Sequence, residues 1–312
     1  MHQEGTILRI DGKTCIVHSD QKEYRAYIKK RIKGAVENQL KPVCVGDKVL
    51  LEVRKEDEVL IHEVLPRKTW LARKAVDHFE KEQVIVANVE QLFVVASFSE
   101  PPFNSGIIDR FLLAASKGNL IPGVIINKSD LKEKEEEKEE EEIHTKIEIY
   151  KKLGYEVLLT SIYSRESIEN LRKKLQGKST VLVGHSGVGK SSLLVSLDSS
   201  LEVFVQSVNA KTFRGRHTTT TVTLWPLPFG GFLVDTPGIR EFALWQMDAR
   251  EVSLYFPEMK SLLPFCKYKS CTHTHEPDCA VKLALEKQEI ALFRYQSYCR
   301  ILESLQGGQE NF

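Results

Sequence analysis

The sequence predicts an α/β protein in three parts, with a mainly parallel sheet between a small β-barrel and a helical region that carries cysteines. Short strand-like stretches fill residues 1–66, apolar strands alternate with helices from about residue 70 to 240, and three of the six cysteines lie between Cys266 and Cys279. Alternating strands and helices are typical of a parallel sheet covered on both faces. We therefore expect domains over residues 1–66, 67–244 and 245–312.

The composition is that of an ordinary soluble globular chain. Of the 312 residues, 42% are hydrophobic and 28% are charged, and the formal net charge is +1. No apolar run reaches the roughly 18 residues that a membrane span needs, and MHQEGTILRIDGK lacks the apolar centre of a signal peptide. We expect a cytoplasmic protein with no membrane partner.

Residues 1–66 contain five short apolar or alternating stretches separated by turn residues. The stretches are TILRI, TCIVHS, EYRAYI, DKVLLEV and LIHEVL. Five short strands in so few residues favour a small barrel of the OB-fold type, although an SH3-like barrel would give a similar pattern.

A basic and aromatic segment lies within this barrel region. Residues 22–34 carry six lysines and arginines against one acid, with Tyr24 and Tyr27 among them. Basic side chains neutralise phosphates and aromatic rings stack on bases, so the segment suits RNA. The alternative is a solvated face of a hairpin.

The central region reads as strands and helices in turn. The acidic run at 132–142 passes into helix-forming residues, which favours a solvated helix face over a functional acidic tail. We expect strands over 91–97, 123–130, 155–162, 179–184, 221–227 and 230–238, and helices over 106–119, 132–154, 167–177 and 189–197.

The stretch GHSGVGKSS fits the phosphate-loop pattern G-x-x-x-x-G-K-[ST] and lies between a strand and a helix, as its mechanism requires. Its glycines let backbone N–H groups curl around phosphates at a helix N-terminus. Lys190 should reach the β- and γ-phosphates and Ser191 should bind Mg²⁺; the alternative is a simple glycine turn. The expected phosphate-binding residues are Gly184, His185, Ser186, Gly187, Val188, Gly189, Lys190, Ser191 and Ser192.

Two further stretches complete a phosphate site. VDTPG ends a strand, where Asp235 can hold Mg²⁺ through a water and the Gly238 N–H can meet the γ-phosphate. RGRHTTTT lies between the phosphate loop and VDTPG, and the hydroxyl of Thr219 can complete the Mg²⁺ shell. The alternative for these threonines is ordinary β-propensity.

The stretch NKSD selects the base. The Asp130 carboxylate can accept hydrogen bonds from N1–H and the 2-amino group of guanine, so a buried acid here would reject adenine. Lys128 can cover the face of the guanine ring, and Asn127 can tie this loop to the phosphate loop. The stretch TSI, with Thr160 and Ser161, can offer a backbone N–H to guanine O6. These loops follow strands, where open α/β sheets bind ligands.

Cysteines and histidines cluster near the C-terminus. Cys266, Cys271, His273 and Cys279 supply four ligands, enough for a closed and therefore structural zinc site. His275 is an alternative fourth ligand, and buried free cysteines are the non-metal alternative.

The order of these motifs resembles that of the circularly permuted GTPases, because NKSD and TSI precede GHSGVGKSS, GRHTTT and DTPG. With the barrel in front and Cys-x4-Cys-x-His-x5-Cys behind, nearly the whole chain is most similar to the ribosome small subunit-dependent GTPase A family. The resemblance implies an OB-fold, a permuted GTPase domain and a zinc domain. The acidic stretch 132–142 is longer than the family pattern, as a surface insertion would be.

The same resemblance implies a bacterial cytoplasmic protein that binds the small ribosomal subunit and its rRNA. It implies late maturation of that subunit, with GTP hydrolysed to GDP. We expect a monomer that does not bind DNA. Two rivals stay open: an RNA-binding assembly factor for which GTP is only a conformational ligand, and a GTPase that serves tRNA or a protein.

Catalysis needs a residue that orients water. Many GTPases place glutamine after the DxxG glycine, but here that residue is Ile239. Intrinsic hydrolysis should therefore be slow, and we consider His217, with Lys190 and Thr219, as catalytic; the alternative for His217 is an exposed or RNA-contacting histidine. The loop after DTPG leads into the zinc domain, so γ-phosphate sensing could move that domain.

Overall fold

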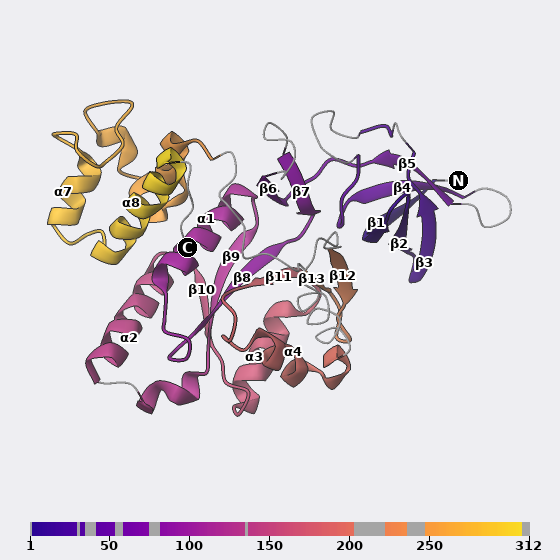
Figure 1. Cartoon of the computed structure of the whole chain (residues 1–312), viewed down its shortest axis with the longest axis horizontal. Coiled ribbons are helices and arrows are strands. Elements are labelled where there is room, and N and C mark those ends of the chain that lie inside the picture. Colours follow the sequence, from indigo (N-terminus) through magenta and orange to yellow (C-terminus); the bar gives the residue numbers. More distant parts are fainter. Residues whose placement is uncertain are drawn as a thin grey trace.

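The computed structural model describes residues 2–29, 32–34, 42–53, 59–74, 82–134, 137–202, 222–235 and 247–307. Figure 1 shows the barrel and the C-terminal helices at opposite ends, with the central sheet and its helices between them. None of the described helices is long and apolar enough to cross a membrane.

The N-terminal strands close into a barrel in the order β1-β2-β3-β5-β4, with β4 returning to β1. The pairing of β3 with β5 is parallel and the other pairings are antiparallel. This is the five-stranded Greek-key barrel of an OB-fold, which confirms that prediction. The strands are β1 (His2–Asp11), β2 (Thr14–Ser19), β3 (Lys22–Tyr27), β4 (Lys48–Val53) and β5 (Val59–Val64).

The central sheet runs in the order β10-β9-β8-β11-β13-β12, and all neighbours are parallel except β12 and β13. This confirms the α/β prediction. The expected strands are present, and those expected over 123–130, 155–162, 179–184 and 230–238 end earlier, where a functional loop begins. They are β8 (Gln91–Ser97), β9 (Ile121–Asn127), β10 (Glu156–Leu159), β11 (Ser179–Val183), β12 (Thr223–Pro226) and β13 (Phe232–Asp235).

Helices cover both faces of this sheet. Alternate residues of β8 point to opposite faces: Val94 packs with α1 and α2, whereas Val95 packs with α3 and α4. The acids of α2 lie on its exposed side while Ile143, Ile147 and Tyr150 are buried, which confirms the solvated-face prediction. The helices are α1 (Ser105–Lys117), α2 (Glu137–Lys152), α3 (Arg165–Leu175) and α4 (Lys190–Leu197), with short 3-10 turns η2 (Ser129–Lys134) and η3 (Ser199–Leu201).

A hairpin that the sequence did not predict lies between barrel and sheet. It comprises β6 (Trp70–Lys74) and β7 (Glu82–Ala87), which pair antiparallel. The backbone N–H of Trp70 donates to Gly118 O at 3.0 Å, and the N–H of Ala87 donates to Val45 O at 2.9 Å. The hairpin therefore joins the barrel to the end of α1.

Strand β1 belongs to both sheets. Arg9 pairs with Thr223 of β12, and a register irregularity against β2 falls between Ile7 and Arg9. Neighbouring residues of a strand point to opposite faces, so Ile7 enters the barrel core and Leu8 enters the core of the central sheet. The barrel thus continues the central sheet.

The C-terminal region packs against α1 through a separate core that includes Leu113. The expected helical stretch 279–305 forms two helices. The elements are η5 (Ala249–Tyr255), α6 (Pro257–Lys260), η6 (Leu263–Phe265), α7 (Ala280–Glu286) and α8 (Leu292–Gly307).

Candidate guanine-nucleotide site and metal cluster

Four functional loops leave the central sheet at one edge. Strands β9, β10, β11 and β13 are parallel, and they end at Asn127, Leu159, Val183 and Asp235. The stretches NKSD, TSI, GHSGVGKSS and DTPG follow these ends directly. The motifs, although their order along the chain is rotated, therefore start from the same side of the sheet, at the carboxyl ends of its parallel strands.

Two glycines of the phosphate loop, Gly184 and Gly189, have no room for a side chain. A Cβ on Gly184, whose φ is +147°, would lie 2.1 Å from Val95 O. Gly189, with φ +90°, precedes the first residue of α4, and a Cβ there would lie 2.4 Å from Asn127 Nδ2. The backbone of the phosphate loop consequently lies in close contact with β8 and with the Asn127–Asp130 loop.

Lys190 begins α4 and folds back over the loop. Its ammonium donates to Gly184 O at 2.7 Å and to His185 O at 2.8 Å. Val188 is buried and anchors the loop, whereas the rest of the loop is open to solvent. The exposed residues are His185, Ser186, Gly187, Ser191 and Ser192.

Asn127 connects three loops. It is buried at the end of β9, and its Nδ2 donates to Val188 O of the phosphate loop at 2.9 Å. Its Oδ1 accepts from Thr160 Oγ1 at 3.1 Å, and Ser129 N donates to Thr160 O at the same distance. The base-side loops and the phosphate loop are thus held in one arrangement by buried hydrogen bonds.

Asp130 is oriented by a neighbouring hydroxyl. Ser161 Oγ donates to its Oδ1 at 2.5 Å. The expectation of a buried acid was wrong, because Asp130 is exposed in the first turn of η2. A carboxylate without a cationic partner is costly to bury, which accounts for the exposure of this side chain.

Lys128 and the segment before α1 are in contact. Lys128 has a φ of +58°, and its ammonium donates to Glu100 O. Phe98 N donates to Asn127 O at 2.9 Å, so residues 98–100 run alongside the start of the Asn127–Asp130 loop. No sequence pattern predicts this role of Glu100, because it uses a backbone carbonyl.

Several predicted residues lie outside the described part of the chain. Asp235 is described only as the last residue of β13. His217, Thr219, Gly238 and Ile239 fall in the ranges 203–221 and 236–246, which the structure does not describe.

Four potential metal ligands lie together near the N-terminus of α7: Cys266, Cys271, His273 and Cys279. Their ligand atoms all lie within 4.8 Å of one another. Cys266 Sγ is 3.9 Å from Cys279 Sγ, and His273 Nδ1 is 3.5 Å and 3.4 Å from these two sulfurs. Ligands around a tetrahedral zinc at about 2.0–2.3 Å stand about 3.4–3.8 Å apart, so this donor set fits zinc.

His275 is outside this group. It is exposed and its Nδ1 lies 3.0 Å from Thr274 Oγ1. Burial lowers the pKa of His273 below its usual value, only partly opposed by Glu276, which favours the neutral imidazole that binds metals. The geometry therefore selects His273 as the histidine of the cluster.

Side chains that the sequence analysis missed support the metal-ligand loop. Burial alone would raise the pKa of Glu276, but hydrogen bonds from Thr272 and Thr274 outweigh it and lower that pKa to about 2. From α8, Tyr295 and Tyr298 donate to His273 O and Thr272 O at 2.8 Å and 2.7 Å. Helix α8 therefore fixes the backbone of the ligand loop.

Known proteins are similar in sequence to this chain over nearly its whole length. The family model for the RsgA GTPase matches residues 64–245. Proteins named "Small ribosomal subunit biogenesis GTPase RsgA" are similar: that of Chlorobaculum tepidum is 38% identical, covering 96% of this chain and 97% of its own, and that of Flavobacterium johnsoniae is 34% identical, covering 99% and 94%.

Solved structures are similar as well. YjeQ from Thermotoga maritima aligns with a TM-score of 0.78 and 31% identity, over 98% of this chain and 99% of that one. YloQ, described as a circularly permuted GTPase, aligns with a TM-score of 0.75 and 26% identity, over 100% and 98%. With its barrel, its rotated GTPase motifs and its Cys/His cluster, the chain belongs to the RsgA GTPase family.

Proposed function

We propose that the protein is a GTPase that acts in late maturation of the small ribosomal subunit and hydrolyses GTP to GDP and phosphate. The observation that carries this proposal is the convergence of the Asn127–Asp130 loop and the phosphate loop at one sheet edge, in a chain whose relatives are named small ribosomal subunit biogenesis GTPases. Such a protein would work in the cytoplasm, as a monomer, on ribosomal RNA and not on DNA.

The nucleotide would lie across the carboxyl ends of β9, β10 and β11. Asp130, oriented by Ser161, would accept from guanine N1–H and the 2-amino group, and the base would then shield this carboxylate from water. Lys190 would exchange its two loop carbonyls for the β- and γ-phosphates.

Mg²⁺ would neutralise charge on the transferring phosphate when bound. Ser191 and Thr219 are the residues we propose to hold it, with Asp235 acting through a water and Gly238 meeting the γ-phosphate. Because Ile239 cannot orient the attacking water, we assign that task to His217.

The His217 assignment is tested by His217→Ala in the presence of small subunits. We expect the stimulated turnover to fall while GTP affinity stays intact. Unchanged stimulated turnover would exclude the assignment.

We further propose one structural Zn²⁺ on Cys266, Cys271, His273 and Cys279. Four protein ligands leave no open position, so the metal would stabilise the loop between η6 and α7 without taking part in catalysis. Domain boundaries at residues 66 and 244 are part of the same proposal.

The barrel would bind rRNA through its basic strand. On β3, Lys22, Arg25 and Tyr27 are exposed while Ala26 points into the core. Exposed cations beside an exposed aromatic ring suit a phosphate backbone with unstacked bases.

Co-sedimentation with separated small and large subunits tests the whole proposal. We expect binding to the small subunit that differs between a non-hydrolysable GTP analogue and GDP. Binding to neither subunit, or only to tRNA or another protein, would refute it. Maturation that still proceeds with Lys190→Ala would favour an RNA-binding factor for which hydrolysis is dispensable.

A further inference from the structure

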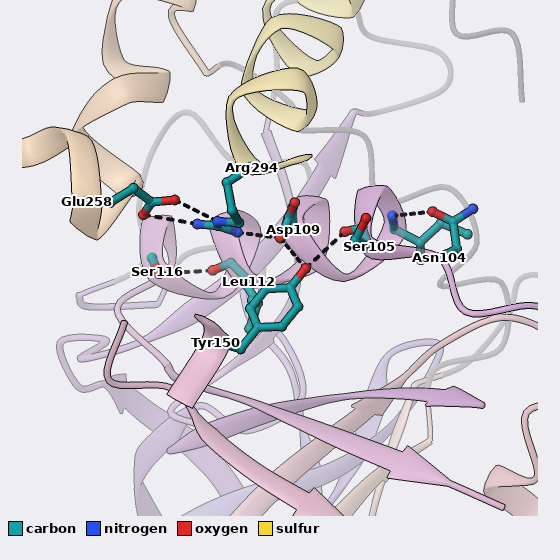
Figure 2. Close-up of polar contacts among 9 residues, drawn as sticks. Asn104, Ser105, Asp109, Leu112, Ser116, Tyr150, Glu258 and Arg294 are labelled. Carbon is teal, nitrogen blue, oxygen red and sulfur yellow. Dashed lines mark hydrogen bonds and ion pairs between the residues drawn. The ribbon is translucent and has the colours of Figure 1, made fainter. Parts of the chain in front are cut away.

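Helix α8 buries a charged residue. The Arg294 side chain is 2% exposed and forms a bidentate pair with Glu258 of α6, with Nε–Oε1 at 2.6 Å and Nη2–Oε2 at 3.3 Å. Its Nη1 donates to Asp109 Oδ1 of α1 (Figure 2). One guanidinium thus joins the C-terminal region to the central domain.

Aromatic rings surround this guanidinium. Its central carbon lies 4.6 Å from the ring centre of Phe256, 5.5 Å from that of Tyr150 and 5.9 Å from that of Tyr155. In such an apolar setting, withdrawing Arg294 would leave Asp109 buried and uncompensated. The contact between α8 and α1 is consequently held in one geometry.

The network continues into the first turn of α1. Tyr150 of α2 donates its hydroxyl to Asp109 Oδ1 at 2.6 Å and approaches Ser105 O at 3.4 Å. Asn104 caps the same turn by accepting from Ile107 N at 3.1 Å (Figure 2). The start of α1 is therefore fixed from two sides.

The segment immediately before this turn contacts the proposed nucleotide site. Ser97 Oγ and the Lys128 ammonium both donate to Glu100 O. Pro101 Cδ lies 3.8 Å from the position of a Cβ on Gly187 in the phosphate loop. A displacement of the α1 start would accordingly move the carbonyl that holds Lys128.

We propose that Arg294 is a positioning residue for the Asn127–Asp130 loop. It acts through Asp109 and the first turn of α1, and then through the Glu100 carbonyl that accepts from Lys128. This role rests on the proposed function, because Lys128 covers a guanine ring only if that site binds guanine nucleotides. Docking of the C-terminal region is then linked to nucleotide affinity without any contact between Arg294 and the nucleotide.

The test compares Arg294→Met in the full chain with the wild type, with GDP binding measured by titration calorimetry. We expect about 5- to 10-fold weaker GDP affinity, within the usual range of coupling between sites. The matched control is Arg250→Met, because Arg250 also pairs with an aspartate, Asp248, in the same region but has a side chain that is 79% exposed. It should leave GDP affinity unchanged.

The same substitution in a Lys128→Met chain distinguishes an effect on Lys128 from a general loss of structure. In a Lys128→Met chain, adding Arg294→Met should cause no further loss, because the effect passes through Lys128. An equal loss in both backgrounds would overturn the proposed route, and so would an unchanged affinity of the single Arg294→Met variant.

If Arg294→Met does not fold, Glu258→Gln, which keeps shape but removes charge, is measured in the same way. A smaller loss that also vanishes in the Lys128→Met background supports the inference, and unchanged affinity overturns it. A wild-type chain that does not bind GDP would instead refute the function proposed above.

Discussion

At the scale of single residues, the nucleotide site depends on hydrogen bonds and close approaches that a single atom can disturb. Asn127 is bonded on both ends of its amide, and Gly189 lies against it. The motif pattern predicted these residues because their chemistry is local to each loop. The pattern did not predict that Asp130 is exposed, since burial depends on neighbours from other segments.

Gly189→Ala should abolish GDP binding. The new Cβ would meet Asn127 Nδ2 at 2.4 Å in a backbone with φ of +90°, so the two loops must separate. Gly154→Ala is the matched control, because Gly154 has a similar φ of +87° and nothing within 4 Å of a Cβ. The control should lose about 1–2 kcal/mol of stability and keep GDP affinity. Equal GDP affinities of the two variants would contradict the close-approach explanation.

His273→Ala should lose the metal and His275→Ala should keep it. Only the ring of His273 lies within reach of Cys266 and Cys279, at 3.5 Å and 3.4 Å, while His275 is bonded to Thr274 at the surface. Metal content after dialysis, measured by atomic emission, distinguishes them. One zinc per chain is expected for wild type and for His275→Ala. Loss of zinc from His275→Ala would show that the assignment of His273 as the ligand is wrong.

At the scale of elements, predictions held where the pattern within a segment decides the structure. The five barrel strands and the helices of the central domain follow from turn residues and hydrophobic periodicity. The β6–β7 hairpin was missed because its position depends on contacts with Gly118 and Val45, which lie far away in the sequence. Arg294 was missed for the same reason, since Asp109 is 185 residues away.

Glu276→Gln should weaken zinc binding about 10-fold, in the lower part of the range for residues that orient ligand loops. Its carboxylate accepts from the Thr272 and Thr274 backbone and from the Thr272 hydroxyl, and a neutral amide, which has one oxygen acceptor, cannot accept all three hydrogen bonds. Competition with a chromogenic chelator measures the change. Asp278→Asn is the control, because that exposed acid pairs with Lys267; a similar loss there would indicate general loop damage.

At the scale of the whole molecule, the two ends of the protein are attached to the central domain by different means. Arg294 attaches the C-terminal region through buried charge, whereas the barrel is attached through β1, with Asp47 and Arg67 paired beside it at 2.6 Å. Movement of the C-terminal region, expected from its link to the loop after Asp235, would have to carry α1 with it.

Leu8→Ala should loosen the barrel from the central domain. Leu8 is 4% exposed and packs into the central core, so truncation should cost about 2–5 kcal/mol and separate thermal unfolding into two transitions. Leu51→Ala removes an equally large side chain from the barrel core alone. Calorimetry should show a destabilised barrel in that variant without the same splitting; a single shared transition for Leu8→Ala would contradict this account.

The pairing of β1 with β12 has one more consequence, for behaviour at high concentration. Among the described strands of the eleven-stranded sheet, the ring of the barrel closes one end, so only β10 lacks a second neighbouring strand, and it is four residues long. Unpaired strand edges recruit strands from other molecules, and short edges do so poorly. By pairing Arg9 with Thr223, the chain covers part of the β12 edge and limits the backbone through which copies of itself could aggregate.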